Sequence, residues 1–246
     1  FKNVSLTYSG SGAPSVEGIN FKAMKGQTIG VIGGTGSGKS SLVNLIPRLY
    51  DATQGEVIVD GVNVKDYNIE TLRNKVGIVM QKAVLFKGTI RENMWMGKKG
   101  ATDEQIDEAL EISQSKEFVD SKQGRLDYVI EQGGKNLSGG QRQRLTIARA
   151  IVRKPDVLIL DDSASALDFA TDAALRKAIR GMNNSPTVFI VSQRAASLMY
   201  ADLIIVLDDG QVAGMGTHDE LLANCEVYKE IYESQFRKAD SEGGVA

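Results

Sequence analysis

The stretch "TIGVIGGTGSGKSS", residues 28–41, decides the fold. An apolar run typical of a buried strand leads into glycines, and residues 33–41 fit the pattern G-x-x-x-x-G-K-[ST]. Glycines in this pattern let backbone N–H groups curl around phosphate oxygens, while the lysine neutralises the β and γ phosphates. We therefore predict a phosphate loop whose contact residues are Gly33, Gly34, Thr35, Gly36, Ser37, Gly38, Lys39, Ser40 and Ser41.

Length and composition limit the class of protein. A chain of 246 residues is long enough for one large domain, or for a domain with a small appendage. The formal net charge is −2 with both signs interspersed, which disfavours a nucleic-acid partner. The longest apolar runs fall far below the roughly 18 residues of a membrane span. The sequence starts at Phe1 inside a strand pattern, so we expect further chain upstream.

The first third of the chain is expected to be rich in strands. Residues 1–8 alternate between apolar and polar side chains with a period of two, which predicts a strand. A helix is predicted from Gly38 to about Arg48, followed by one strand over "GEVIVDG" with a turn at Asp60 and Gly61. The order strand, loop, helix, strand fits a phosphate-loop core.

The rest of the chain first becomes helical and then alternates. Residues 89–122 predict a helical subdomain, in which Thr102 or Asp103 caps a helix with an apolar face. A helix through Ala150, a strand over 157–161, a helix over about 168–182 and a strand over 187–191 follow. This alternation predicts an α/β fold with a mainly parallel sheet.

The strand "VLILDD", residues 157–162, ends on two aspartates. At the end of a parallel strand beside the phosphate loop, Asp161 is expected to hold Mg²⁺ through water, and the Ser40 hydroxyl is expected to bind the same ion.

Three ordered motifs give a resemblance to a known family. "LSGGQRQRLTIARA" at 137–150, "VLILDD" and then "SALD" at 165–168 resemble the signature helix, metal strand and following loop of the ATP-binding cassette family. The likeness covers residues 1–236 and implies binding of ATP and Mg²⁺. It implies a phosphate-loop NTPase core with an N-terminal antiparallel β subdomain (1–80 and 157–236), an inserted α-helical subdomain (82–156) and a flexible tail (237–246).

The resemblance also assigns roles to individual residues. Tyr8 stands where the family stacks a ring on adenine, and Gln81 where it senses Mg²⁺ and the γ-phosphate. The signature residues Ser138, Gly139, Gly140 and Gln141 then face the phosphate loop of a second such domain, so that two ATP molecules are sandwiched between two domains. The segment from Ser165 to Asp168 is expected to relay between the sites.

The stretch "LFKGTIREN", residues 85–93, is similar to that of exporter-type cassettes. This likeness implies a transmembrane domain fused upstream, whose coupling helices contact the domain at the cytoplasmic side of the cell membrane. "EQGGKN", residues 131–136, stands where exporters make that contact. We interpret Arg142, Arg144 and Arg149 as solvated or ion-paired helix positions, because basic residues on a helix are usually so.

Two positions depart from the family pattern, and both bear on catalysis. Asp162 replaces the Glu that positions or deprotonates the attacking water, and a group misplaced by about 1 Å can cost on the order of a hundredfold in rate. Gln193 replaces a His that contacts the γ-phosphate, and Gln cannot carry a proton. The pattern resembles the degenerate subunit of a heterodimeric exporter, in which a partner domain supplies the missing groups.

Three alternatives stay open. The domain could be a self-sufficient homodimer in which Asp162 serves as the base, or a soluble cassette ATPase that acts on DNA or ribosomes, or an ATP-binding regulatory module without hydrolysis. The charge balance opposes the second of these. The transported substrate cannot be read from the chain.

Overall fold

The structure is a computed structural model that describes residues 1–163 and 166–242, apart from the side chains of 236–242. The chain forms two compact units, one of Phe1–Arg73 with Thr187–Ala246 and the other of Asn74–Pro186. Helix α2, Ile69–Lys75, lies at the junction of the two in sequence. We describe each unit by itself.

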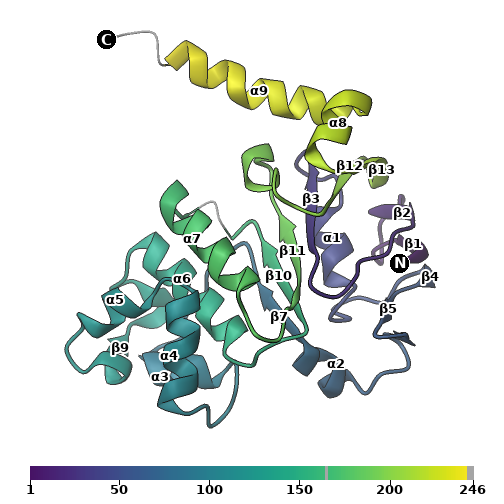
Figure 1. Cartoon of the computed structure of the whole chain (residues 1–246). Coiled ribbons are helices and arrows are strands. Elements are labelled where there is room, and N and C mark those ends of the chain that lie inside the picture. The colour runs from purple at the N-terminus through teal and green to yellow at the C-terminus, as the bar shows by residue number, and fades with distance from the viewer. Residues whose placement is uncertain (164–165, 243–246) are drawn as a thin grey trace. The chain divides into compact units, whose positions relative to one another are not determined.

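The first unit combines strands with few helices (Figure 1). Its elements are β1 Lys2–Leu6, β2 Val16–Ile19, β3 Thr28–Gly33, α1 Lys39–Asn44, β4 Gln54–Glu56, β5 Ile58–Val59, β6 Val62–Asn63, β11 Thr187–Val191, η3 Ala195–Ser197, β12 Leu203–Asp208, β13 Gln211–Gly216, α8 His218–Asn224 and α9 Glu226–Glu242.

Strand pairing in this unit places β3 at the centre. Strands β11 and β12 flank β3 and run parallel to it, and β13 adds an antiparallel edge. Every residue of β3 and β11 is buried, as expected of strands covered on both faces. A separate antiparallel sheet has the order β2-β1-β4, which confirms the predicted N-terminal β subdomain.

Two predictions of local structure in this unit were wrong. The helix after the phosphate loop ends at Asn44 instead of near Arg48, because Pro47 disfavours a helical residue before it and Arg48 adopts a left-handed φ of 52°. The single strand predicted over 55–61 is divided, because β4 pairs with β1 whereas β5 forms a hairpin with β6. The predicted turn at Asp60 and Gly61 is confirmed.

The second unit is mostly helical. Its elements are β7 Val76–Val79, β8 Gly88–Thr89, α3 Ile90–Trp95, α4 Asp103–Ile112, α5 Lys116–Asp120, η1 Arg125–Asp127, β9 Val129–Ile130, η2 Gln132–Gly134, α6 Gly139–Ile151, β10 Val157–Asp161 and α7 Phe169–Arg180. Strands β10 and β7 are parallel, as β3 is with β11 and β12 in the first unit, so the predicted α/β class with parallel pairing of the central strands is confirmed.

Helix α4 buries the face that the sequence predicted. Ile106, Ala109 and Leu110 are all at most 1% exposed. Thr102 caps the helix: its hydroxyl accepts from the Gln105 N–H, and the Gln105 side chain accepts from the Thr102 N–H, which completes a capping box.

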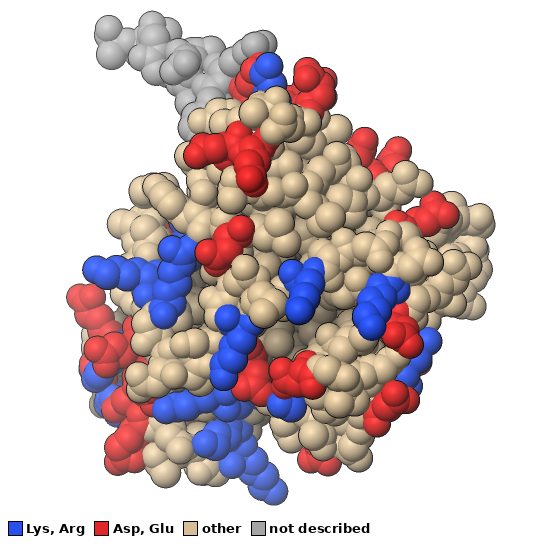
Figure 2. Space-filling model, turned by 45° about the vertical axis from the view of Figure 1, so that its right-hand side comes forward, with Lys and Arg blue, Asp and Glu red and all other residues tan. Residues whose placement is uncertain are grey.

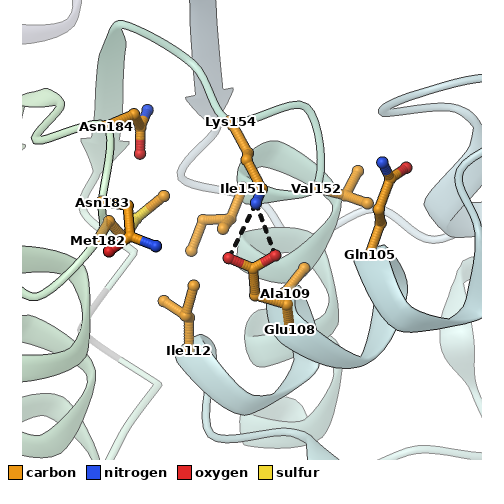
Figure 3. Close-up of a pocket in the computed structure, with 10 residues that line it drawn as sticks. All are labelled: Gln105, Glu108, Ala109, Ile112, Ile151, Val152, Lys154, Met182, Asn183 and Asn184. Atoms are coloured by element: carbon orange, nitrogen blue, oxygen red, sulfur yellow. Dashed lines mark hydrogen bonds and ion pairs between the residues drawn. The ribbon is translucent and has the colours of Figure 1, made fainter.

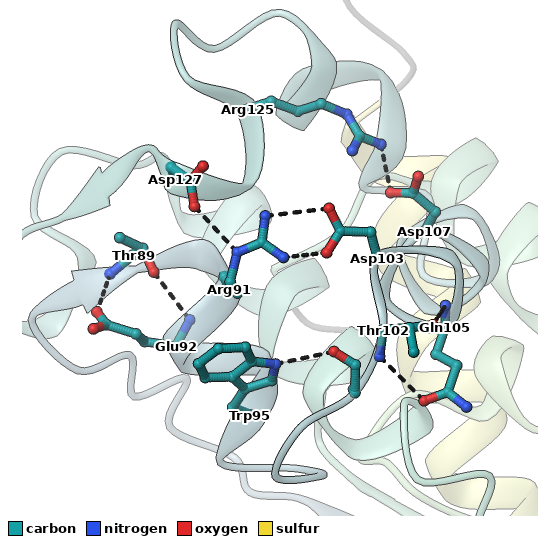
Figure 4. A network of polar contacts seen from close by, with 11 residues as sticks. Thr89, Arg91, Glu92, Trp95, Thr102, Asp103, Gln105, Asp107, Arg125 and Asp127 are labelled. Atoms are coloured by element: carbon teal, nitrogen blue, oxygen red, sulfur yellow. Dashed lines mark hydrogen bonds and ion pairs between the residues drawn. The ribbon is translucent and has the colours of Figure 1, made fainter.

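An ion-pair network ties the helices of this unit together (Figure 4). The Arg91 guanidinium of α3 binds the carboxylates of Asp103, at the start of α4, and of Asp127 in η1. Hydrogen bonding to these two carboxylates raises the pKa of Arg91. Arg125 makes a second link, to Asp107 of α4. The pairs are partly exposed, so their main effect is to fix the orientation of the helices.

Charge is mixed over the surface. Figure 2 shows lysine and arginine side chains interspersed with aspartate and glutamate on the face that it presents. Local pairs such as Arg48 with Asp51 and Lys116 with Asp120 account for part of this mixing.

Among residues 1–163 and 166–242, no helix is both long and apolar enough to cross a bilayer. Helix α9 extends to Glu242 and therefore includes residues 237–242, which the sequence analysis had placed in a tail. Residues 243–246 of that tail lie outside the described residues.

Replacing Thr102 with Ala should lower the free energy of unfolding by about 1 kcal/mol, because the Gln105 N–H at the N-terminus of α4 loses its hydroxyl acceptor. The matched control is Thr102→Ser, which keeps the hydroxyl and should stay close to the wild type. Urea unfolding followed by circular dichroism measures both. Equal loss in the two variants would contradict the assigned cap.

Candidate functional site

The phosphate loop connects β3 to α1 in the first unit. Gly33 ends β3, residues 34–36 are exposed, and Ser37 is buried. The Lys39 ammonium folds back into the loop, where it donates to the carbonyl oxygens of Gly33 at 2.9 Å and Gly34 at 2.5 Å. The chain therefore forms a loop at the predicted residues, and the Lys39 ammonium is held against the loop backbone.

Gly36 and Gly38 of the loop both have left-handed backbone angles. Gly38 has a φ of 95°, and a Cβ there would lie 2.3 Å from the Ser15 carbonyl oxygen, so no larger residue fits without movement. Gly36 has a φ of 85°, but a Cβ there would meet nothing within 4 Å. We call Gly38 the base of the loop, because the backbone there is closely packed, and Gly36 its rim, because nothing packs against it.

Tyr8 lies beside the helix that follows the loop. Its hydroxyl donates to Ser41 Oγ at 2.9 Å, and its ring packs edge-on against Tyr50 with centroids 4.9 Å apart. Ser40 and Ser41 are half-buried in the first turn of α1. The first unit therefore brings Tyr8 next to Ser41 at the end of the phosphate loop.

The acidic strand end lies in the second unit. Asp161 is the last residue of β10 and only 4% exposed. Asp162 follows with a φ of 45°, a left-handed conformation that Asp tolerates better than most residues. Gln81 Nε2 donates to Asp162 Oδ2 at 3.2 Å, so two residues separated by 81 positions meet here.

The signature motif begins α6. The Ser138 hydroxyl accepts from the Gln141 N–H, and the Gln141 side chain accepts from the Ser138 N–H. Gly139 and Gly140 form the first turn between these residues. The motif is thus a capped helix N-terminus, whose dipole suits an anion. Ser165, the first residue of the expected relay segment, lies outside the described residues, whereas Asp168 caps α7.

The interpretation of three basic residues on α6 was wrong. Arg142, Arg144 and Arg149 donate to the backbone carbonyl oxygens of Leu137, Gln114 and Val84 rather than to carboxylates. Burial lowers the pKa of Arg144 and of Arg149, and their guanidinium groups lie over the rings of Phe118 and Phe86. They therefore hold loops onto the helix.

Gln193 lies in the loop after β11, in the first unit. The residue is exposed, and its carbonyl oxygen accepts from Gln235 Nε2 of α9 at 2.7 Å. Sequence reasoning missed Gln235, because a single Gln on a helix has no motif around it. The chain's one histidine, His218, follows the Thr217 cap of α8, and its Nδ1 lies 2.8 Å from Tyr228 Oη.

Comparison with known proteins identifies the family to which the chain belongs. A family model described as ABC transporter matches residues 16–165. The chain belongs to the ABC transporter family. It is an ATP-binding domain of that family, whose ATP-binding domains are ATPases.

Relatives of this ABC domain are known from several bacteria. An uncharacterized ABC transporter ATP-binding protein of Mycobacterium bovis is 43% identical over 98% of the chain and 41% of its own length. A putative multidrug export ATP-binding/permease protein of Staphylococcus aureus is 39% identical over 95% of the chain and 40% of its own length. The chain thus spans about two fifths of these relatives.

A solved structure is also similar. The ATP-bound structure of a bacterial Atm1-family ABC exporter has a TM-score of 0.90 and 31% identity, over 96% of this ABC domain and 41% of that chain.

The residues of this ABC domain fit a nucleotide with its metal. The open rim at Gly36 leaves room for phosphate oxygens, and the Lys39 ammonium supplies the charge that they need. Within the described part of the chain, no three His, Cys, Asp or Glu side chains gather as a metal site. Mg²⁺ usually takes one or two protein oxygens together with phosphate oxygens, and the half-buried Ser40 hydroxyl in the first turn of α1 is an oxygen ligand of this kind.

A separate pocket of about 260 Å³ lies in the second unit (Figure 3). Its walls include Ile112 of α4, Ile151 of α6 and Met182, which follows α7. Lys154 and Glu108 form an ion pair that lies among these side chains in the close-up, with Nζ to Oε2 at 2.7 Å. None of the predicted site residues lines this pocket.

Replacing Gly38 with Ala should lower the melting temperature without nucleotide more than Gly36→Ala does. Both variants place a Cβ on a left-handed residue, but only the first also drives it against the Ser15 carbonyl oxygen. Differential scanning fluorimetry measures both under identical conditions. Equal shifts would contradict the close approach at the base of the loop.

Proposed function

We propose that this domain binds MgATP and works as the ATP-driven motor of a membrane exporter, with its own site impaired in hydrolysis. The observation that carries the proposal is the contrast between an intact phosphate loop and two substituted catalytic positions, Asp162 and Gln193. The loop fits a triphosphate and the lysine is in place. Binding should therefore be tight, while the splitting of ATP should be slow.

Binding follows from the chain's own groups. The backbone N–H groups of the loop and Lys39 hold the phosphates, while the Tyr8 ring stacks on the adenine. Ser40, Asp161 and Gln81 would hold Mg²⁺, with Asp161 acting through water and Gln81 also contacting the γ-phosphate. The ion would supply charge neutralisation of the phosphates.

Asp162 is the first reason to expect slow hydrolysis. Its side chain is one methylene shorter than Glu, and it is engaged by the Gln81 amide at 3.2 Å. Because the shorter side chain keeps the carboxylate farther from the attacking water, and the Gln81 hydrogen bond holds it there, the carboxylate orients that water poorly. Asp also suits the left-handed backbone at this position, so the substitution places little strain on the turn.

Gln193 is the second reason. Its amide can hydrogen-bond a γ-phosphate oxygen, but it brings neither the charge nor the proton of an imidazolium. It therefore favours recognition of ATP over stabilisation of the charge that develops during cleavage. Both substitutions therefore keep the affinity for ATP and reduce the rate of its hydrolysis.

The signature helix supports the role of a partner. Its capping box leaves the first turn of α6 well ordered, with Gly139 and Gly140 free of side chains that would block an anion. We propose that this helix completes the active site of a second ABC domain, which carries the Glu and His. The assembly is then a heterodimer with one active and one slowly hydrolysing site.

The contact with membrane helices is proposed on the second unit. Val84, Phe86 and Val129 are between 40% and 56% exposed, which is high for apolar side chains. The segments that carry them are joined, because the Gly133 N–H donates to the Leu85 carbonyl oxygen and β8 pairs with β9. This apolar surface suits the coupling helices of a transmembrane domain, which we propose to contact it at the cytoplasmic side of the membrane. The relatives named as export ATP-binding/permease proteins support this reading.

Restoring both groups, Asp162→Glu with Gln193→His, should raise single-turnover hydrolysis of ATP in this domain's phosphate loop at least tenfold when a partner signature helix is present. The gain arises because a carboxylate reaches the water and an imidazole reaches the γ-phosphate. Rapid quench with labelled ATP measures it, and Asp162→Asn with Gln193→His is the matched control. An unchanged rate in the restored variant would contradict the proposed cause of slow hydrolysis.

A further inference from the structure

One side chain of α9 holds the loop that follows β11 at two points. Gln235 Nε2 donates to the Gln193 carbonyl oxygen at 2.7 Å, and Gln235 Oε1 accepts from the Ala195 N–H at 2.9 Å. The nitrogen and the oxygen of one side-chain amide therefore both hydrogen-bond to the loop backbone, on the two residues that flank Arg194. All of these residues belong to the first unit. A planar amide engaged at both ends fixes the direction of the loop backbone as well as its distance from the helix.

The loop has further support at its base. The Ser192 N–H donates to the Val31 carbonyl oxygen of β3 at 3.1 Å, and Ser192 Oγ accepts from the Arg194 N–H at 2.9 Å. Ser192 is 3% exposed and Ala195 is fully buried, whereas Gln193 is exposed. The buried residues fix the two ends of the loop, and Gln235 fixes the backbone of the exposed residue between them.

Helix α9 is itself firmly anchored where it carries Gln235. Tyr228 lies seven residues earlier, on the same face of the helix, and is fully buried. Its hydroxyl lies 2.8 Å from His218 Nδ1 of α8. Because Gln235 follows this anchor by two turns, its amide is presented from an ordered surface, and ordering its side chain costs less conformational entropy than on a frayed end.

We propose that Gln235 is a positioning residue for recognition of the γ-phosphate, acting through the backbone of Gln193. The inference rests on the proposed function, in which the Gln193 amide contacts the γ-phosphate. A loop that shifts by a fraction of an ångström takes the amide out of hydrogen-bond range. ADP has no γ-phosphate, so the contact between α9 and this loop should matter for ATP and not for ADP. By reciprocity, bound ATP strengthens the docking of α9 onto the loop.

The test compares ATP with ADP affinity in variants of Gln235. Gln235→Leu removes both hydrogen bonds at similar size, and Gln235→Glu keeps an acceptor for Ala195 but turns the donor into an oxygen facing the Gln193 carbonyl. We expect each to weaken ATP binding about tenfold and to change ADP binding by less than twofold. Ser234→Ala is the matched control, because the Ser234 hydroxyl bonds only within α9, to Ile231. It should leave both affinities unchanged.

Isothermal titration of the purified protein with Mg²⁺ and a non-hydrolysable ATP analogue, and separately with ADP, gives both affinities. An unchanged ratio of the two affinities in a folded Gln235 variant overturns the inference, and so does an equal loss for both nucleotides. If Gln235→Leu does not fold, Gln235→Glu decides in the same way.

Two further variants separate this inference from the proposed function. Lys39→Ala should lose tight binding of the ATP analogue, and Gln193→Ala should show the same selective loss as Gln235→Leu. If Lys39→Ala or Gln193→Ala leaves the affinity for the ATP analogue unchanged, the proposed function fails. If both behave as expected while Gln235→Leu does not, the inference about Gln235 alone fails.

Discussion

The rest of the site depends on the absence of a side chain at Gly38. The loop backbone passes so close to the Ser15 carbonyl oxygen that only hydrogen fits, and the left-handed φ of this residue turns the chain into α1. Because of that turn, Lys39 can fold back onto the Gly33 and Gly34 carbonyl oxygens. Binding of a triphosphate then follows from a geometry set before any ligand arrives, so little has to be reorganised when it binds.

Binding and hydrolysis make different demands on a site, and in the proposed function this domain meets them unequally. Affinity for a triphosphate comes from charge and many backbone donors, which tolerate small displacements. Hydrolysis needs a carboxylate and a γ-phosphate contact placed to within a fraction of an ångström. The substitutions at Asp162 and Gln193 fall on the second set alone, whereas the phosphate loop and the capped signature helix are complete. A slow site next to a partner's active one can act as a long-lived clamp.

Features coded by a few adjacent residues were predictable from the sequence, and features that depend on distant partners were not. The buried face of α4 and the strands β10 and β11 follow from the hydrophobic period, and the structure confirms them. Glycine spacing predicts the turn from β3 into α1, whose binding of phosphate stays a prediction. The early end of α1 depends on Pro47. The break between β4 and β5 depends on their pairing with different strands. Gln235 and the arginines of α6 bond to backbone carbonyl oxygens far away in sequence, and no pattern of residue types marks such partners.

The most direct test of the central claim is the chemical identity of the nucleotide that the protein retains. The purified protein, free of contaminating ATPases, is incubated with Mg²⁺ and ATP labelled at the γ-phosphate, separated from free nucleotide and denatured, and the released nucleotide is analysed. The account predicts that intact ATP remains bound after many minutes. Conversion to ADP within about a second, the pace of a typical enzyme, would contradict it.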